Sequence, residues 1–102
     1  METTPGSLCT EAERFRLEML VELNDDTGIT REVSVCCVFF VTNRFFSAGE
    51  PIELTLVFEY VEPNHSVRLR CRGQVVHTEQ RNGEMDVTVA LEAYRFETHH
   101  NV

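Results

Sequence analysis

The feature that most constrains the fold of this chain is an alternation of apolar and polar side chains that continues along most of its length. A period of two places successive side chains on opposite faces of an extended strand. No stretch of ten or more residues carries the 3.6-residue apolar repeat of an amphipathic helix. Alternating runs occupy residues 16–23, 29–35, 52–60, 67–75 and 85–93, and a nearly continuous apolar run occupies residues 36–42. Six predicted strands therefore indicate an all-β fold, a six-stranded antiparallel barrel with little or no helix.

Residues that favour tight turns separate the predicted strands. The segment from Asn24 to Gly28 is rich in Asn, Asp and Gly, and Asn82-Gly83 is the strongest short signal for a β-hairpin. In the second strand, Ile29 is expected on the same face as the apolar residues that follow it. Tyr94 and the next aromatic residue, Phe96, lie one position out of phase with the apolar residues before them, which predicts a bulge or a bend.

The chain has the size of one domain. Its 102 residues match a single unit with one hydrophobic core. Residues 1–11 show no periodicity and are predicted to form a flexible leader, residues 12–97 the barrel domain, and residues 98–102 a flexible C-terminus. The sequence has no run of about 18 apolar residues and no signal-peptide pattern at its N-terminus. We therefore expect a cytoplasmic protein without membrane insertion.

The charge balance is strongly acidic. The net charge of −8 arises from 17 acidic and 9 basic residues, and every basic residue is arginine. Binding to DNA or RNA depends on clustered positive charge that neutralises phosphates, so we expect neither as a partner. A compact phosphate ligand is compatible with this composition, because two or three arginines hold such a group locally.

Cysteines and histidines show no spacing typical of a chemical site. Cys9, Cys36, Cys37 and Cys71 form no Cys-x-x-Cys or zinc-binding pattern, and we expect reduced, partly buried thiols. A redox or nucleophilic cysteine remains the alternative. The sequence has no recognisable nucleophile–base pairing, phosphate loop or metal cluster. We therefore expect no enzyme activity, no metal and no cofactor.

The order of several segments resembles a bacterial PilZ domain. The most specific local matches are Gly73–Val76 and Glu32–Val33–Ser34, and the resemblance extends from about residue 12 to residue 97. In chain order, the matching segments are AERFRLEMLVEL, GITREVSVCCVFFVT, AGEPIELTLVF, RCRGQVVHTE and VALEAYRFE. The resemblance implies a PilZ-like β-barrel that takes part in signalling by the second messenger cyclic di-GMP.

In the PilZ family, an Arg-x-x-x-Arg segment ahead of the first strand and a following Asp/Asn-x-Ser-x-x-Gly motif bind cyclic di-GMP. If Arg16 is the second arginine of this segment, the first position falls on Ala12, and Arg14 substitutes only in part. In the second motif Glu32 replaces Asp or Asn and Ser34 is retained. Cys37 replaces the glycine, at a cost of about 1–2 kcal/mol if this position requires a positive φ.

The altered motif changes the expected function. The resemblance implies a non-enzymatic binding or adaptor module in which direct binding of cyclic di-GMP is weak or lost, and which acts through a protein partner. The alternative is a functional cyclic di-GMP receptor in which Arg14, Arg16, Glu32 and Ser34 hold the ligand, with Cys37 beside them.

A second group of residues is a candidate interaction patch. Arg68, Arg70 and Arg72 alternate with inward residues and share one face of a predicted strand. Phe45 and its neighbour Phe46 are candidate anchors for a partner protein if they are exposed. The simpler interpretation of the three arginines is a solvated strand face, and the other is a second anion site or a contact for an acidic partner.

Overall fold

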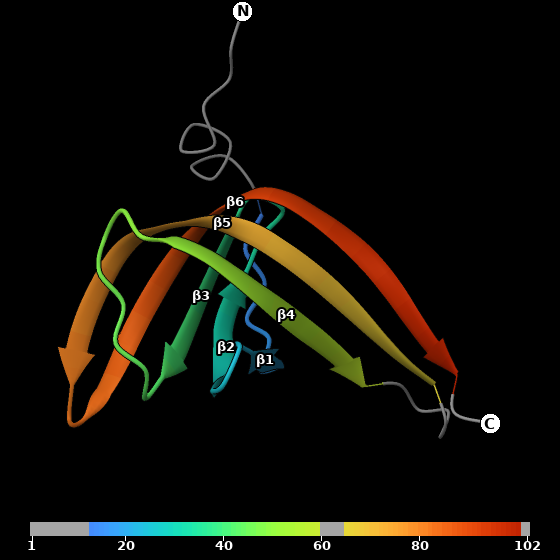
Figure 1. Ribbon diagram of the computed structural model, residues 1–102, viewed down its shortest axis with the longest axis horizontal. Helices are drawn as coiled ribbons and strands as arrows, with labels where there is room; N and C mark the ends of the chain where they lie inside the picture. The colour runs from blue at the N-terminus through green and yellow to red at the C-terminus, as the bar shows by residue number, and fades with distance from the viewer. Residues whose placement is uncertain (1–12, 60–64, 101–102) are drawn as a thin grey trace, which may run out of the picture.

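The computed structural model describes residues 13–59 and 65–100, and these residues form a closed antiparallel β-barrel (Figure 1). The strands are β1 (Leu20–Glu22), β2 (Thr27–Val33), β3 (Cys37–Thr42), β4 (Pro51–Glu59), β5 (His65–Arg81) and β6 (Glu84–His100). Their order around the barrel is β1-β2-β3-β6-β5-β4. The described residues contain no helix, so none that is long and apolar enough to cross a membrane occurs among them. The predicted six-stranded antiparallel barrel is confirmed.

Inward side chains of five strands form the core, and Val33 of β2 packs against it. Val21 on β1, Phe40 on β3 and Leu56 on β4 are fully buried, and on β4 and β5 the predicted alternation places the apolar residues inside. Burial of apolar surface is the main favourable term in folding, so this shared interior is what holds the short β1 in the barrel. The core comprises Val21, Leu23, Val38, Phe40, Phe46, Ile52, Leu54, Leu56, Leu69, Cys71, Val75, Met85, Val87, Val89 and Leu91.

The long hairpin of β5 and β6 dominates the molecule and curves along its whole upper side in Figure 1. Its turn has positive φ at Asn82 (47°) and Gly83 (82°), as the Asn-Gly pair predicts. The pairing of β5 with β6 contains two bulges. One lies on β5 between Val75 and His77, and the other lies on β6 at Glu92, which has no partner on β5. Because of these bulges the hairpin bends far enough to close the barrel.

The bulge at Glu92 accounts for the change of phase that the sequence predicts near the end of β6. Beyond it Tyr94 lies opposite Cys71 and therefore faces the same side as that core residue. Ala93, for which the alternation predicts an inward side chain, lies opposite Arg72 and is exposed. β6 continues as a strand to His100, into the segment expected to be a flexible C-terminus. The leader expected at residues 1–11 lies outside the described residues.

The face assignment predicted for β2 is wrong at its start. Ile29 is 47% exposed, whereas Thr30 is fully buried. The register between β2 and β3 shifts between Thr30 and Glu32, so Arg31 has no partner on β3. A bulge of this kind changes which residues face the core on either side of it.

Candidate functional site

Four of the five residues predicted to bind cyclic di-GMP lie around one small pocket of about 100 Å³. Arg14 reaches it from the segment before β1, Glu32 lies on β2, Ser34 lies in the β2–β3 turn, and Cys37 begins β3. The remaining lining residues are Val33, Phe39 and Thr88. The fifth predicted residue, Arg16, is exposed and does not line the pocket. Ala12 lies outside the described residues.

The segment that carries Arg14 is attached to the end of β2. Phe15 and Val33 exchange two backbone hydrogen bonds of 2.9 Å, which bring Arg14 close to Glu32. The Arg14 guanidinium lies 3.9 Å from the Glu32 carboxylate, and the arginine side chain is 62% exposed. An exposed ion pair at this distance contributes little to stability. Its main effect is that the acceptor expected to face a ligand already has a cationic partner.

Ser34 is buried and is committed to the turn between β2 and β3. Its hydroxyl oxygen accepts hydrogen bonds from the backbone N–H groups of Cys37 at 3.1 Å and Cys36 at 3.4 Å. The Ser34 backbone N–H in turn donates to the Cys37 carbonyl oxygen at 2.9 Å. A serine that satisfies two backbone donors in this way closes the turn. Its hydroxyl is therefore not directed toward open solvent.

The cysteines of the β2–β3 turn differ from expectation in two respects. Neither Cys36 nor Cys37 has a positive φ, since Asn82 is the only described non-glycine residue that does. The backbone strain considered for Cys37 is therefore absent. Both residues are disulfide-bonded, which corrects the prediction of reduced thiols at these positions. Cys71 is a free, buried thiol, as predicted.

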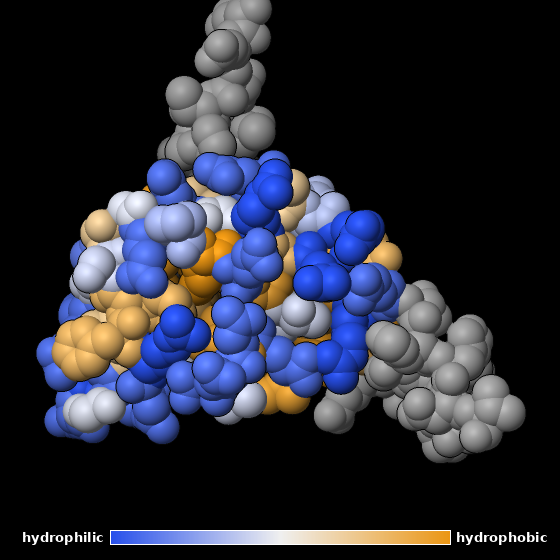
Figure 2. Space-filling model, in the orientation of Figure 1, coloured by the Kyte–Doolittle hydropathy of each residue, from blue (hydrophilic) through white to orange (hydrophobic). Residues whose placement is uncertain are grey.

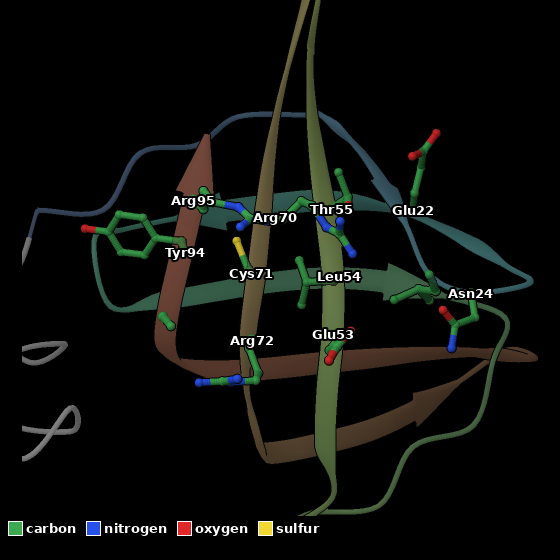
Figure 3. A pocket seen from close by; sticks show the side chains of 12 residues that line it. Glu22, Asn24, Glu53, Leu54, Thr55, Arg70, Cys71, Arg72, Tyr94 and Arg95 are labelled. Atoms are coloured by element: carbon green, nitrogen blue, oxygen red, sulfur yellow. The ribbon is translucent and has the colours of Figure 1, made fainter. Parts of the chain in front are cut away.

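A larger pocket of about 460 Å³ lies over β4, β5 and β6 and contains part of the predicted arginine patch (Figure 3). Arg70 and Arg95 are direct cross-strand partners on β5 and β6, and Arg72 lies opposite Ala93. Figure 2 shows strongly hydrophilic residues gathered over the right-hand half of these strands, with apolar surface beside them. The lining residues are Glu22, Leu23, Asn24, Glu53, Leu54, Thr55, Arg70, Cys71, Arg72, Ala93, Tyr94 and Arg95. We call this the arginine pocket.

Carboxylates neutralise only some of the arginines on this face. Both Arg70 and Arg95 lie 3.6 Å from the same carboxylate oxygen of Glu97. Arg68 is paired with Glu22 and does not line the pocket. Within the described part of the chain, Arg72 has no ion pair. The lining also includes Glu22 and Glu53, and Glu53 lies opposite Arg72 on β4, so the three arginines of the pocket face nearly as many carboxylates.

Sequence reasoning missed Arg95, although the hairpin turn contains the signal for it. The turn pairs Arg81 with Glu84, and counting outward without bulges places Arg95 opposite Arg70. Each strand of the hairpin carries one bulge, and the two shifts cancel before this pair is reached. The simple count therefore gives the correct partner.

The aromatic part of the predicted patch is only half correct. Phe45 is 67% exposed, but Phe46 is buried and packs edge-on against Phe40 with ring centroids 6.4 Å apart. The guanidinium of Arg44 lies 5.1 Å from the Phe46 ring centroid and covers it. Neither phenylalanine lines the arginine pocket. The five residues predicted as one patch therefore do not form a single surface.

The described residues offer little support for nucleophilic or metal chemistry. Burial raises the pKa of the Cys71 thiol from 9.0 to about 11, so the thiol is protonated at neutral pH. The thiol also donates a hydrogen bond to the Leu69 carbonyl oxygen at 3.6 Å. No group of three or more His, Cys, Asp or Glu side chains positioned to hold a metal occurs within the described ranges. Among the described residues, the arginine side chains at the two pockets are the groups best placed to bind a ligand or partner.

Comparison with protein-family models and with curated proteins gives no match to this chain, so its function is inferred from the fold and from the geometry of the two pockets.

Proposed function

We propose that this chain is a PilZ-like, non-enzymatic binding module that acts as an adaptor in cyclic di-GMP signalling and binds the dinucleotide weakly or not at all. The observation that carries the proposal is that the pocket around Arg14, Glu32, Ser34 and Cys37 is small and that two of these side chains, Glu32 and Ser34, are already engaged by other groups of the protein. The position of this pocket on a six-stranded barrel supports a relationship to PilZ-type cyclic di-GMP receptors. Its small size and internal contacts support the loss of ligand binding.

The size of this pocket argues against a bound dinucleotide. Its volume is about 100 Å³, whereas sites that enclose an organic ligand typically span about 300–1000 Å³. Two of the groups needed for recognition are also engaged within the protein. Glu32 faces Arg14, and the Ser34 hydroxyl holds the β2–β3 turn. A ligand would have to break these contacts and open the pocket before it gained its own.

The alternative is a functional receptor, and one observation favours it. Arg14 and Arg16 are both exposed, so their guanidinium groups have room to move toward a ligand. Stacking on guanine and bidentate contact with phosphate are interactions that arginine makes well. This alternative requires the exposed segment to rearrange around the dinucleotide.

Calorimetric titration of the full chain with cyclic di-GMP separates the two proposals. We expect no detectable heat with ligand at about 100 µM. The double variant Ala12→Arg with Cys37→Gly is expected to gain binding, since it restores the first arginine and the glycine of the family motif and leaves Glu32 as the remaining difference. Binding by the unmodified chain at or below about 10 µM that is lost in Arg16→Ala, but kept in Arg81→Ala, would instead establish the receptor.

The arginine pocket is the surface that we propose for contact with an acidic protein partner. It combines three arginines with a volume of about 460 Å³, and interfaces are enriched in arginine and tyrosine, both of which occur here. An acidic peptide labelled with a fluorophore is expected to bind more weakly to Arg70→Ala with Arg72→Ala than to the unmodified chain. Arg81→Ala removes an arginine outside the pocket and is the matched control. Equal affinity for all three chains would exclude this surface.

A further inference from the structure

The second half of β6 has one edge with which no described strand pairs. β3 pairs with β6 only as far as Cys37↔Ala90, and the last bond on that side runs from the Leu91 N–H to the Cys36 carbonyl oxygen at 2.8 Å. From Glu92 to His100, the only described strand that pairs with β6 is β5. In Figure 1 this half of β6 forms the outer rim of the molecule. Such an edge is a template for another strand, and this one contains no proline to block it.

The backbone groups on this edge belong to Tyr94 and Phe96. Leu91 faces the core and directs its N–H away from β5, toward β3. In a strand of L-residues, all residues on one face direct their N–H and C=O groups to the same edge. Tyr94 and Phe96 lie opposite the core residues Cys71 and Leu69, so they share the face of Leu91. Their backbone groups therefore point to the unpaired edge.

Two large aromatic side chains are exposed beside these groups. Tyr94 is 52% exposed and Phe96 is 61% exposed. Phe96 is supported from one side by Phe58, with ring centroids 6.3 Å apart. On the opposite face of the strand, Arg95 and Glu97 lie on either side of Phe96. Aromatic area next to unpaired backbone groups is the combination that favours addition of a strand.

We propose that this edge binds the same edge of a second copy of the chain, and that β6 pairs with β6 antiparallel about a two-fold axis at Phe96. In this register Phe96 lies opposite Phe96 of the second copy, and the two residues exchange both backbone hydrogen bonds. Arg95 then lies opposite Glu97 of the second copy, and Glu97 opposite Arg95 of the second copy. The charge pattern around Phe96 is thus self-complementary, as an interface between identical surfaces requires.

The dimer joins the two barrels into one continuous sheet. The two-fold axis is perpendicular to this sheet, so the outer faces of both copies lie on the same side. Arg95 lines the arginine pocket, and pairing therefore places the two pockets next to each other on that side. The inference does not depend on whether the chain binds cyclic di-GMP, because it rests on the edge of β6 alone.

Sedimentation equilibrium of the full chain between about 10 µM and 1 mM tests the proposal with charge exchanges. Arg95→Glu and Glu97→Arg each place like charges opposite one another at two symmetric positions, and each is expected to weaken the dimer about tenfold or more. The double variant with both exchanges restores opposite charges and is expected to dimerise within about threefold of the unmodified chain. Arg31→Glu makes the same change in net charge as Arg95→Glu at an exposed site on β2 and is expected to leave the dimer unchanged. Thermal unfolding at low concentration checks that each variant is folded.

Hydrogen exchange supplies a second measurement that does not rely on variants. At dimer-forming concentrations the amides of Tyr94 and Phe96 are expected to exchange more slowly, whereas those of Arg95 and Glu97, which face β5, keep their rates. A chain that stays monomeric at about 1 mM overturns the proposal. A dimer that the single charge exchanges leave intact, or that the double exchange fails to restore, overturns it as well.

Discussion

Thr30 and Met19 are joined by two hydrogen bonds that attach the segment before β1 to β2. The backbone N–H of Thr30 donates to the Met19 carbonyl oxygen at 2.9 Å, and the Met19 N–H donates to the Thr30 hydroxyl at 2.8 Å. The same hydroxyl donates to the Leu17 carbonyl oxygen. Thr30 is fully buried. Its hydroxyl makes the hydrogen bonds to Met19 and Leu17 that a backbone group would make in a regular pair of strands. The position of Arg14, three residues ahead of Leu17, depends on this attachment.

Replacing Thr30 with valine tests this attachment. Valine keeps the shape and β-propensity of threonine but leaves the Met19 N–H and the Leu17 carbonyl without their partner. We expect the free energy of unfolding to fall by about 2 kcal/mol, measured by urea denaturation. Thr88→Val is the control, because the Thr88 hydroxyl makes no hydrogen bond to the described residues. Equal losses in the two variants would contradict the role assigned to Thr30.

Replacing Ser34 with alanine tests whether its hydroxyl serves the turn. The backbone N–H groups of Cys36 and Cys37 lose their acceptor, so we expect a loss of about 1–2 kcal/mol in the free energy of unfolding. Ser47→Ala, in the exposed loop between β3 and β4, is expected to change it by less than about 0.5 kcal/mol. If Ser34→Ala is as neutral as Ser47→Ala, the hydroxyl is not needed for the turn and is available to a ligand.

Gly73 allows β5 and β6 to approach closely at a bulge. A Cβ atom at this position would lie 2.1 Å from the carbonyl oxygen of Ala90, a backbone atom that cannot move aside without displacing β6. We expect Gly73→Ala to destabilise the protein by about 2–4 kcal/mol in thermal or urea unfolding. Gly49 has a φ of 92°, and nothing lies within 4 Å of the place that a Cβ would occupy. We therefore expect Gly49→Ala to lower the free energy of unfolding by only about 1 kcal/mol, the cost of holding alanine in a left-handed backbone conformation. The order of the two losses is the decisive result.

The buried thiol of Cys71 makes stability depend on alkaline pH. Burial raises its pKa from 9.0 to about 11, so folding favours the neutral thiol. This contribution is complete below pH 9, where the thiol is neutral in both states, and declines as pH rises because only the unfolded chain ionises freely. Between pH 9 and about 11 we expect a loss of about 1–3 kcal/mol by urea unfolding at a series of pH values.

Cys71→Val is the comparison for this pH series. Valine suits a buried strand position and does not titrate, so the part of the alkaline slope that belongs to the thiol should disappear. An unchanged slope between pH 9 and 11 would show that the loss does not come from the Cys71 thiol.

The number of strands and most of the core follow from the sequence. Period-two alternation in β4 and β5 identifies the buried residues directly, because both strands keep a regular register with each other. The Asn-Gly turn sets the hairpin of β5 and β6 and even predicts that Arg70 lies opposite Arg95. Local patterns succeed here because each depends on residues close in the chain or on a continuous ladder.

The candidate site is harder to predict from the sequence, because it depends on how separate segments meet. The motif names Arg14, Glu32, Ser34 and Cys37, and all four line one pocket. The motif does not reveal that Arg14 faces Glu32 or that Ser34 closes its own turn. Nor does it show that Arg16 lies apart from the pocket, since that depends on the hydrogen bonds between Phe15 and Val33.

What the amino-acid sequence determined by itself is the all-β class, the number of strands and the faces of the regular ones, because side-chain alternation is a local property of an extended chain. The sequence signals a change of phase near the end of β6, but only the tertiary structure places that bulge at Glu92 and introduces another at Arg31, because a bulge forms where two strands must bend to close the barrel. Those bulges bury Thr30 in place of Ile29 and turn Ala93 outward.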